Sequence, residues 1–417
     1  MAIVDLVRER GPLTVAAFME LALYDSRIGY YARVARRSGR AGDFFTSVDV
    51  GPIFGELVEI QLAEMAQILA SSAEAGRFSD RDAGRVLLDP PEANGEPNPD
   101  KVHPPRAFDL VEAGAGNGQL AADILRAARR NDPAFYNRLR LHLVEASPLA
   151  RAAQPSTLGE VGERLATSAG EVPLSFEGAL LANELLDAFP VHQVVMREEG
   201  LCEVYVHAVG QADSGTSEGG LITREGPLST PALAEYLAQL KIALEPGWRV
   251  EINLRATEWV RDAARRLRRG FIVIIDYGHE ARELYSVTHA GGTLTTFTRH
   301  TMAGPEASGV PSWLNRPGDQ DITAHVDFTS VRAAAEAEGM LTLGFLDQTY
   351  FLMGLLAGGR ESFAVSDTRI ADLANDSRPL KTLLMPGGLG STHKVLILGK
   401  NIGAPTLRGC SYRMRVT

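Results

Sequence analysis

Cysteine is nearly absent from this chain, with 2 residues among 417. Cys202 and Cys410 stand far apart in sequence and lack the short spacing of metal ligands. The sequence therefore predicts neither a disulfide framework nor a cysteine zinc site. A reducing compartment fits this composition.

Long apolar runs are also missing. No stretch of about 18 apolar residues predicts a membrane span, so we expect no membrane insertion. The first fifteen residues carry Asp5 and Glu9 and lack the apolar core of a signal or transit peptide. These absences lead us to expect a cytoplasmic protein.

Basic residues are fewer than acidic ones: the chain has 42 Lys and Arg and 52 Asp and Glu, which gives a net charge of −10. This balance gives the whole chain no attraction to nucleic acid or to an anionic membrane, so we expect no nucleic-acid partner. The basic run at 261–270 falls on a predicted helix and is best explained as a solvated face. With 45% hydrophobic residues the chain can bury a sizeable core, and its length suggests roughly two to three domains.

What the sequence does contain is a glycine-rich stretch, FDLVEAGAGNGQ, at 108–119. An apolar run, alternating glycines and the helical pattern that follows predict a buried strand, a tight loop and a helix. Gly114, Gly116 and Gly118 alternate, and Gln119 stands where a dinucleotide fingerprint has its third glycine. The spacing therefore disfavours a dinucleotide site. A glycine turn in another kind of α/β protein is the remaining alternative.

Glu112 lies two residues before the first glycine, at the predicted end of the strand. A carboxylate there repels a pyrophosphate and attracts a cation. S-adenosylmethionine has no phosphate and carries an ammonium and a sulfonium. The motif therefore predicts that Glu112, Gly114, Gly116 and Gly118 bind this methyl donor.

Glu145 ends the second predicted strand, within RLRLHLVEAS. In doubly wound folds an acid at this position accepts hydrogen bonds from ribose hydroxyls, so we assign Glu145 to the donor site. A strand-terminal glutamate of no functional role is the alternative.

A third predicted strand end brings further polar residues. GALLANELLDAF predicts a strand that ends at Asn183, with Glu184 and Asp187 on the turn beyond. Ligands of open parallel sheets bind outside the carboxyl ends of the strands, so Asn183 and Glu184 should face the transferred methyl group. GFIVIIDYG predicts another strand, buried on both faces and ending near Asp276.

The stretch DITAHVDFT places Asp321, His325 and Asp327 just before a helix that Asp327 or Thr329 can cap. A histidine beside carboxylates can be structural, can act as an acid or base, or can be part of a metal site. These alternatives stay open for His325, and the sequence assigns no metal ligands.

The predicted organisation has two parts. Residues 1–107 hold N-terminal helices, a structured loop at Gly29 to Ser47 that we interpret as a lid, and a long linker from 71. Residues 108–417 form the α/β core, with an acceptor-side insertion at about 190–250 and a helical insertion at about 350–390.

With these residues in hand, the sequence resembles the MidA family of S-adenosylmethionine-dependent methyltransferases, which includes a mitochondrial arginine methyltransferase of complex I assembly. The resemblance rests on segments spread in order along the chain: GYY (29–31), GDFFTS (42–47), FGE (54–56), VEAGAGNGQLAADIL (111–125), ANELLDAFPV (182–191), IDYG (275–278), GTL (292–294), DITAHVDFT (321–329) and HKVLILG (393–399). It implies a Rossmann-like class I core with a mostly parallel seven-stranded sheet. It also implies that Gly42, Asp43 and Thr46 lie over the donor.

The function we expect is methyl transfer from S-adenosylmethionine, with S-adenosylhomocysteine as product, to an arginine of a protein acceptor. The guanidinium is always charged and pairs with carboxylates, so Glu184, Asp187, Asp276 and Asp321 are the candidate acceptor ligands. His325 could accept the proton, which makes His325, Asp321 and Glu184 the expected catalytic residues. The alternatives are a small-molecule carboxyl or hydroxyl O-methyltransferase and a donor-binding assembly factor without turnover. A homodimer is compatible with the sequence.

Overall fold

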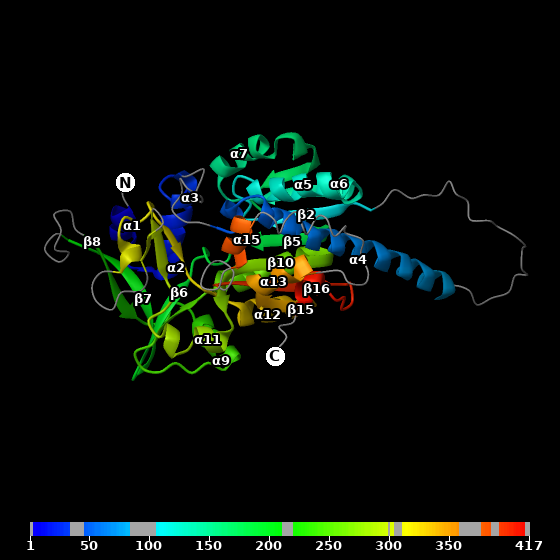
Figure 1. Ribbon diagram of the computed structural model, residues 1–417. Coiled ribbons are helices and arrows are strands. Elements are labelled where there is room, and N and C mark those ends of the chain that lie inside the picture. Colours follow the sequence, from blue (N-terminus) through cyan, green and yellow to red (C-terminus); the bar gives the residue numbers. More distant parts are fainter. Residues whose placement is uncertain are drawn as a thin grey trace, which may run out of the picture.

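The computed structural model describes residues 3–33, 46–83, 106–210, 220–298, 301–303, 311–357, 377–384 and 392–412. Its centre is an eight-stranded sheet (Figure 1) with the order β15-β16-β10-β5-β2-β3-β4, to which β14 adds by pairing with β10. In chain order the strands are β2 (Phe108–Ala113), β3 (Leu139–Val144), β4 (Leu165–Ala169), β5 (Phe176–Asn183), β10 (Leu267–His279), β14 (Val326–Asp327), β15 (Leu341–Asp347) and β16 (His393–Lys400).

The sheet is mostly parallel, as the sequence predicts. Strands β4, β3, β2, β5 and β10 run parallel, and β16 is antiparallel to both of its neighbours. Strand order reverses between β2 and β5, because the chain continues from β2 outward to β3 on one side and from β5 to β10 on the other. Doubly wound sheets bind ligands at such a reversal, outside the carboxyl ends of the strands.

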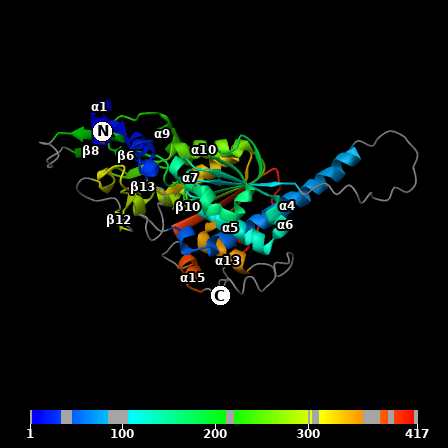
Figure 2. The same cartoon turned by 90° about the horizontal axis from the view of Figure 1, so that it is seen from above.

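Helices cover both faces of this sheet, which makes three layers (Figure 2). Alternate side chains of a strand point to opposite faces, so Leu110 and Val111 of β2 enter different cores. The core on the Leu110 side is closed by α4 (Ile53–Ala83), α5 (Gln119–Asn131), α6 (Pro133–Arg138), α7 (Pro148–Leu158), α13 (Gln348–Ala357) and α15 (Ser377–Leu384). The core on the Val111 side is closed by α10 (Leu254–Arg266) and α12 (Phe328–Glu336).

Side-chain caps fix where these helices begin. Asn253 accepts from the backbone N–H of Ala256 at the start of α10. Asp327 accepts from Thr329 N and Ser330 N at the start of α12, which confirms one of the two predicted caps.

A second sheet forms the other lobe (Figure 1), in the order β1-β7-β6-β9 with β8 paired to β7. Its strands are β1 (Leu13–Thr14), β6 (His192–Arg197), β7 (Gly200–Val209), β8 (Gly220–Gly226) and β9 (Arg249–Ile252). The N-terminal segment is part of this lobe, because Leu13 pairs with Val206. One core is shared by the insertion and the N-terminal helices α1 (Ile3–Arg10), α2 (Val15–Met19), the π-helix η1 (Glu20–Tyr24) and α3 (Tyr30–Arg33).

Smaller elements complete the described chain. They are η2 (Val48–Val50), η3 (Gly159–Arg164), α9 (Ala232–Leu240), α11 (Ala281–Leu284), η4 (Val287–His289), η5 (Ser312–Leu314), η6 (Arg408–Cys410) and a three-stranded sheet of β11 (Thr295–Thr298), β12 (Thr301–Ala303) and β13 (Asp321–Thr323). Within the described ranges, no helix has both the length and the apolar character needed to cross a membrane.

Two predicted boundaries are wrong. The predicted loop from residue 71 is helical as far as Ala83, since α4 continues (Figure 1). The first proline after Pro52 is Pro90, so nothing in 71–83 excludes the helix. The basic run at 261–270, which we expected on one helix, is divided between two elements, because α10 ends at Arg266 and Leu267 already belongs to β10.

Candidate functional site

The glycine loop after β2 is a left-handed turn that only glycine forms without strain. Gly114, Gly116 and Gly118 have φ of 74°, 52° and 84°. The backbone N–H groups of Gly114 and Ala115 both donate to the carbonyl oxygen of Val144, at 2.9 and 3.1 Å, so the loop lies over the end of β3. A Cβ on Gly114 would lie 3.0 Å from Leu185 Cδ1, whereas one on Gly116 would meet nothing within 4 Å. The loop therefore presents open backbone at Gly116 and packs against the turn after β5 at Gly114.

Glu112 is buried at the end of β2. Its Oε2 accepts from the backbone N–H of Ala121, 3.1 Å away in the first turn of α5, so it also satisfies a helix-terminal donor. Burial is the main cause that raises the pKa of Glu112 to about 8; the hydrogen bond from Ala121 opposes the rise, and the charges of Glu145 and Asp123 add to it. A cationic group beside Glu112 would favour its ionised form.

Glu145 joins the end of β3 to the glycine loop. Its Oε2 accepts from Gly116 N at 2.8 Å, and its Oε1 accepts from Ser147 N at 2.7 Å. The carboxylate therefore lies beside the predicted donor loop, at the position the sequence assigns to ribose recognition.

Of the other residues predicted to bind the donor, the structure describes Asn183 and Thr46 but not Gly42 and Asp43. Asn183 ends β5, and in the described part of the chain its buried Oδ1 has no hydrogen-bond donor. Thr46 is buried, and its N–H and hydroxyl both donate to Asp49 Oδ2, at 2.9 and 2.8 Å. Gly42 and Asp43, with most of the predicted lid, lie outside the described residues.

Four carboxyl groups meet next to this loop. We call them the acid cluster: Glu184, Asp187, Asp276 and Asp321. The pKa of Asp187 is raised well above its usual range, first by burial and then by the charges of the other three. The structure thus brings together four acids that the sequence spreads over 138 positions, from 184 to 321.

Asp276 fixes the turn that carries two of these acids. Its Oδ2 accepts from Leu185 N and Leu186 N, at 3.1 and 2.8 Å, and its Oδ1 accepts from Tyr277 N at 2.9 Å. Burial is the main cause that raises the pKa of Asp276 to about 7, and the charge of Glu184 adds to it. With three backbone donors bound, Asp276 has mainly a positioning role.

Glu184 holds a strained backbone conformation, with φ of 50°, that L-residues other than glycine rarely adopt. Its N–H donates to the carbonyl of Ile275 at 2.8 Å. Its Oε1 accepts from Ser47 N at 3.3 Å and lies 3.5 Å from His393 Nε2. Strain of this kind persists where surrounding contacts impose it, which is common at functional sites.

The opposite side of the acid cluster comes from the loop around β13. Asp321 accepts from the hydroxyl of Tyr31 at 2.8 Å, and Ala324 N donates to the backbone oxygen of Asp187 at 2.9 Å. Asp187 Oδ1 is buried and has no hydrogen-bond partner among the described residues. A buried acceptor of this kind is suited to a ligand that donates hydrogen bonds.

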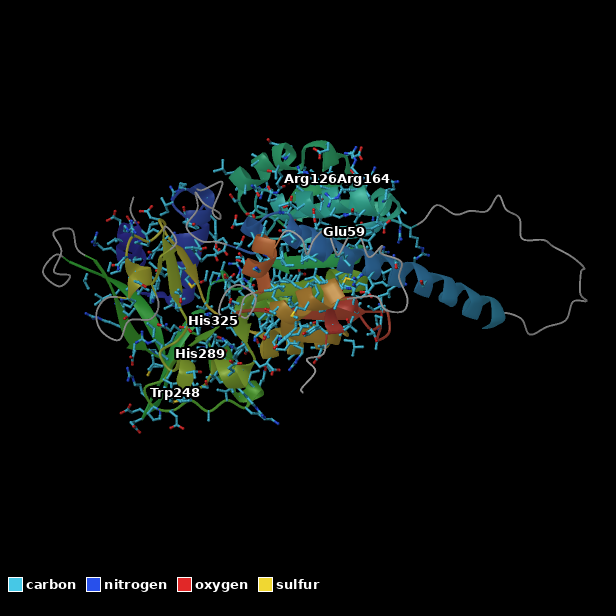
Figure 3. All side chains as sticks on the ribbon, in the orientation of Figure 1. Glu59, Arg126, Arg164, Trp248, His289 and His325 are labelled. Carbon is cyan, nitrogen blue, oxygen red and sulfur yellow. The ribbon has the colours of Figure 1, made fainter. Side chains whose placement is uncertain are left out.

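His325 lies in a different group of side chains, although it follows Asp321 by only four residues. Its ring is 5.3 Å from that of His279 and 5.8 Å from that of His289. Figure 3 shows His289 and His325 side by side. Burial, and then these two histidines, lower the pKa of His325 to about 4. It is therefore a weak base at neutral pH, and no acid of the cluster is among the groups that shift its pKa.

Sequence reasoning missed two residues of the acid cluster's surroundings. His393, fully buried at the start of β16, packs against Tyr277 with ring centroids 3.9 Å apart and the ring planes tilted by 41°. Tyr31 reaches Asp321 from the N-terminal lobe. Both belong to segments that carry the family resemblance, GYY and HKVLILG, so those motifs were the available signal.

Comparison with known proteins agrees with this geometry. Residues 85–346 match the family described as "Putative S-adenosyl-L-methionine-dependent methyltransferase". The chain is 28% identical over 380 residues to the mitochondrial protein arginine methyltransferase NDUFAF7 homolog of Drosophila melanogaster, covering 84% of this chain and 73% of the relative. It is 28% identical over 374 residues to the mouse protein arginine methyltransferase NDUFAF7, covering 84% and 72%.

A solved structure supports the donor assignment. The chain is similar to a "likely methyl transferase" from Burkholderia thailandensis bound to S-adenosylhomocysteine, with a TM-score of 0.76 and 25% identity, covering 99% of this chain and 94% of that one. The open backbone at Gly116 and the acceptor of Asn183 are compatible with S-adenosylmethionine as the cofactor of this chain.

The expected cytoplasmic location is wrong by the same comparison, because the curated relatives are named as mitochondrial proteins. That expectation rested on the scarcity of cysteine and of long apolar runs, and such features of a folded chain do not determine the compartment to which it is delivered.

The family match covers more than half of the chain and includes the whole glycine loop. The protein is thus an S-adenosylmethionine-dependent methyltransferase, and it belongs to the family that its resemblance to MidA indicated.

Proposed function

We propose that this enzyme methylates the guanidinium of an arginine on a protein acceptor, and that the acid cluster binds this guanidinium. The observation that carries the proposal is Asp187, whose buried Oδ1 lacks a partner among the described residues while three other carboxyl groups surround it. The names of the curated relatives, protein arginine methyltransferases, support the same acceptor.

A guanidinium matches this cluster in charge and shape. It stays protonated at any physiological pH and presents five N–H donors in a planar fork that carboxylates accept in pairs. The repulsion that raises the pKa of Asp187 is relieved when a cation enters. A carboxylic acid acceptor would bring a further negative charge against the same groups, so the cluster disfavours that alternative.

The donor residues lie next to the cluster. Glu112, Gly114, Gly116, Gly118, Glu145 and Asn183 are the donor ligands we propose. Leu185, which contacts the Gly114 side of the loop, directly follows Glu184, so the two parts of the site share one turn. Bound S-adenosylmethionine supplies the methyl group.

The acceptor nitrogen must lose one proton as it gains the methyl group. We assign that proton to Asp187, because its buried Oδ1 has no partner among the described residues and can accept the proton once the guanidinium favours the ionised carboxylate. Glu184 and Asp321 orient the guanidinium, and Asp276 positions the turn. This assignment replaces His325, whose pKa is lowered and whose ring faces two other histidines.

The test is transfer of a labelled methyl group to the proteins of a cell lysate, followed by acid hydrolysis and amino-acid analysis. Label recovered as methylarginine supports the proposal, provided that Gly114→Val protein gives none. Base-labile label or label in extractable small molecules would overturn it in favour of an O-methyltransferase. No label, with S-adenosylhomocysteine still bound in a calorimetric titration, would overturn it in favour of a factor without turnover.

A further inference from the structure

Three histidines from separate elements converge beside the acid cluster. His279 ends β10, His289 ends η4, and His325 directly precedes β14. One ring nitrogen from each lies within 4.8 Å of the others. We propose that this histidine trio binds a divalent transition-metal ion of the Zn²⁺ type.

The separation of the three histidine rings is compatible with binding one metal ion. In a tetrahedral zinc site the Zn–N distance is about 2.0–2.1 Å, which puts coordinating nitrogens about 3.4 Å apart. The ring centroids are separated by 4.8, 5.3 and 5.8 Å, so small side-chain rotations bring the nitrogens to that distance.

Glu283 lies against two of the rings from outside. Its backbone oxygen accepts from His289 Nδ1 at 3.0 Å. Its Oε1 lies 3.0 Å from His279 Nδ1, but that nitrogen makes no hydrogen bond among the described residues. A carbonyl oxygen accepts only from N–H, so His289 Nδ1 carries the proton and His289 Nε2 keeps a lone pair. Metal-binding histidines have this outer hydrogen bond in most sites.

His325 shares with His279 the lack of a hydrogen bond at Nδ1 among the described residues. Its Nδ1 is buried and has no hydrogen bond within the part of the chain that the structure describes. Burying an unpaired ring nitrogen is costly, and coordination is one way to satisfy it. The backbone of His325 is nevertheless held in place, because its N–H donates to Thr293 Oγ1 at 3.1 Å.

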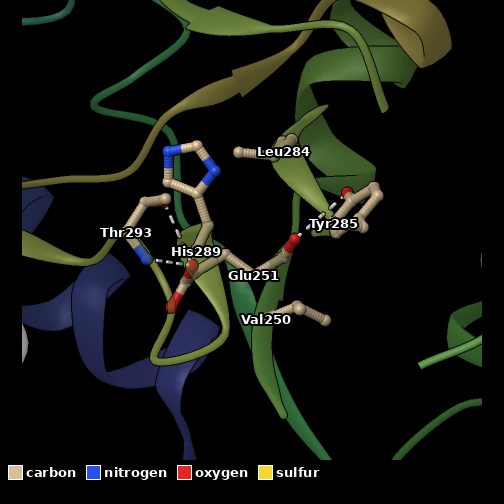
Figure 4. A pocket seen from close by; sticks show the side chains of 6 residues that line it. All are labelled: Val250, Glu251, Leu284, Tyr285, His289 and Thr293. Carbon is tan, nitrogen blue, oxygen red and sulfur yellow. Dashed lines mark hydrogen bonds between the residues drawn. The ribbon is translucent and has the colours of Figure 1, made fainter. Parts of the chain in front are cut away.

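The surrounding loops are fixed by a buried carboxylate. Glu251 Oε2 accepts from Thr293 N at 2.7 Å and from Thr293 Oγ1 at 3.1 Å, and Gln193 Nε2 donates to its Oε1 at 2.8 Å. Figure 4 shows Glu251, Thr293 and His289 around the small pocket beside the trio. Two of the three histidine segments therefore lie on one hydrogen-bonded scaffold, which is the preorganisation a metal site needs.

Donor chemistry selects the class of metal. Three imidazoles suit Zn²⁺, Cu²⁺, Ni²⁺ or Fe²⁺, while Mg²⁺ and Ca²⁺ prefer oxygen ligands. Three protein ligands leave a fourth position for water. The ion would fasten the end of β10, three residues beyond Asp276, to the segment that follows Asp321.

The test uses the full chain, stripped of metal with a chelator and titrated with Co²⁺ and then Zn²⁺. We expect about one equivalent of Co²⁺ to bind with the intense visible absorption of a tetrahedral site, and Zn²⁺ to displace it. His289→Ala and His325→Ala should each weaken binding by at least about 10²-fold, and Glu283→Ala by about 10- to 100-fold. His207→Ala, a histidine of β7, is the matched control and should bind like the parent.

Calorimetric titration with S-adenosylhomocysteine confirms that each variant is folded. The proposal is overturned if the parent binds no stoichiometric metal, or if folded His289→Ala and His325→Ala proteins bind it as the parent does. The parent titration decides alone if the variants do not fold. None of these measurements depends on the identity of the methyl acceptor, so their failure leaves the proposed function intact.

Discussion

The backbone N–H of Ser47 donates to Glu184 Oε1 at 3.3 Å and so joins residues that are 137 positions apart. Ser47 ends the GDFFTS motif, and Glu184 belongs to the acid cluster. The hydroxyl of Ser47 contacts a different residue, Gln348, so backbone and side chain have separable contacts. The segment that we interpret as a lid is therefore attached to the acceptor side of the site at its last residue.

Ser47→Pro tests that attachment. Proline removes the N–H, and the φ of −58° at this position suits its ring. A hydrogen bond to a charged group contributes about 1.5–3 kcal/mol, so turnover should fall about 10- to 100-fold. Ser47→Ala keeps the N–H and should lose less activity. Equal turnover of both variants would show that the Ser47–Glu184 bond has no catalytic importance.

Gly114→Val should abolish donor binding. Valine is strained at φ of 74°, and its Cβ would lie 3.0 Å from Leu185 Cδ1. Gly159→Val is the control, because Gly159 also has positive φ and its Cβ would meet nothing within 4 Å. We expect calorimetry to detect S-adenosylhomocysteine binding in the control alone, with both variants folded by thermal melting. Unchanged affinity in folded Gly114→Val would remove the glycine loop from the donor site.

The raised pKa of Glu112 predicts that the stability of the protein depends on pH. Its pKa is raised from 4.5 to about 8 in the folded protein. The folded state binds more protons than the unfolded state between these values, so the free energy of unfolding falls as pH rises through that window. Glu112→Gln keeps an acceptor for Ala121 N and should flatten part of the fall between pH 5 and about 8 in ligand-free thermal melts. Parallel curves for parent and variant would refute this.

The carboxylate of Asp187, which we propose is needed for activity, should lower the stability of the folded protein. Its pKa is raised well above the usual range, so the ionised form destabilises the folded protein once the pH exceeds the ordinary aspartate range. Asp187→Asn removes that charge with nearly the same shape and should raise the melting temperature at pH 8. The gain should shrink at pH 5, which lies closer to the ordinary aspartate range, because the cost of the raised pKa accumulates as pH rises above that range. A lower melting temperature at both pH values would show that the carboxylate is structural.

The sequence was sufficient for the parts of the site that sit at strand ends. Carboxyl ends of parallel strands meet at one edge, so Gly114, Glu145, Glu184 and Asp276 could be expected to converge from four apolar runs alone. The strands end within a few residues of the predicted positions, at Ala113, Val144 and Asn183.

Contacts between lobes could not be predicted in this way. Tyr31 reaches Asp321 because the N-terminal helices pack in one core with the insertion and with Ile322, the residue after Asp321. His325 faces two histidines rather than the nearby acids, because Thr293 holds its backbone against the loop that follows η4. Such placements depend on long-range packing, which no local pattern encodes.

The most direct measurement of the central claim is the methyl-transfer rate of Asp187→Asn on a protein acceptor, with donor affinity measured on the same protein. Glu245→Gln, which removes an exposed carboxylate of the insertion, is the control. Our account predicts that turnover of Asp187→Asn falls about 10²-fold or more while its affinity for S-adenosylhomocysteine and the activity of the control stay close to the parent. Turnover within about threefold of the parent, less than about 1 kcal/mol of barrier, would contradict it.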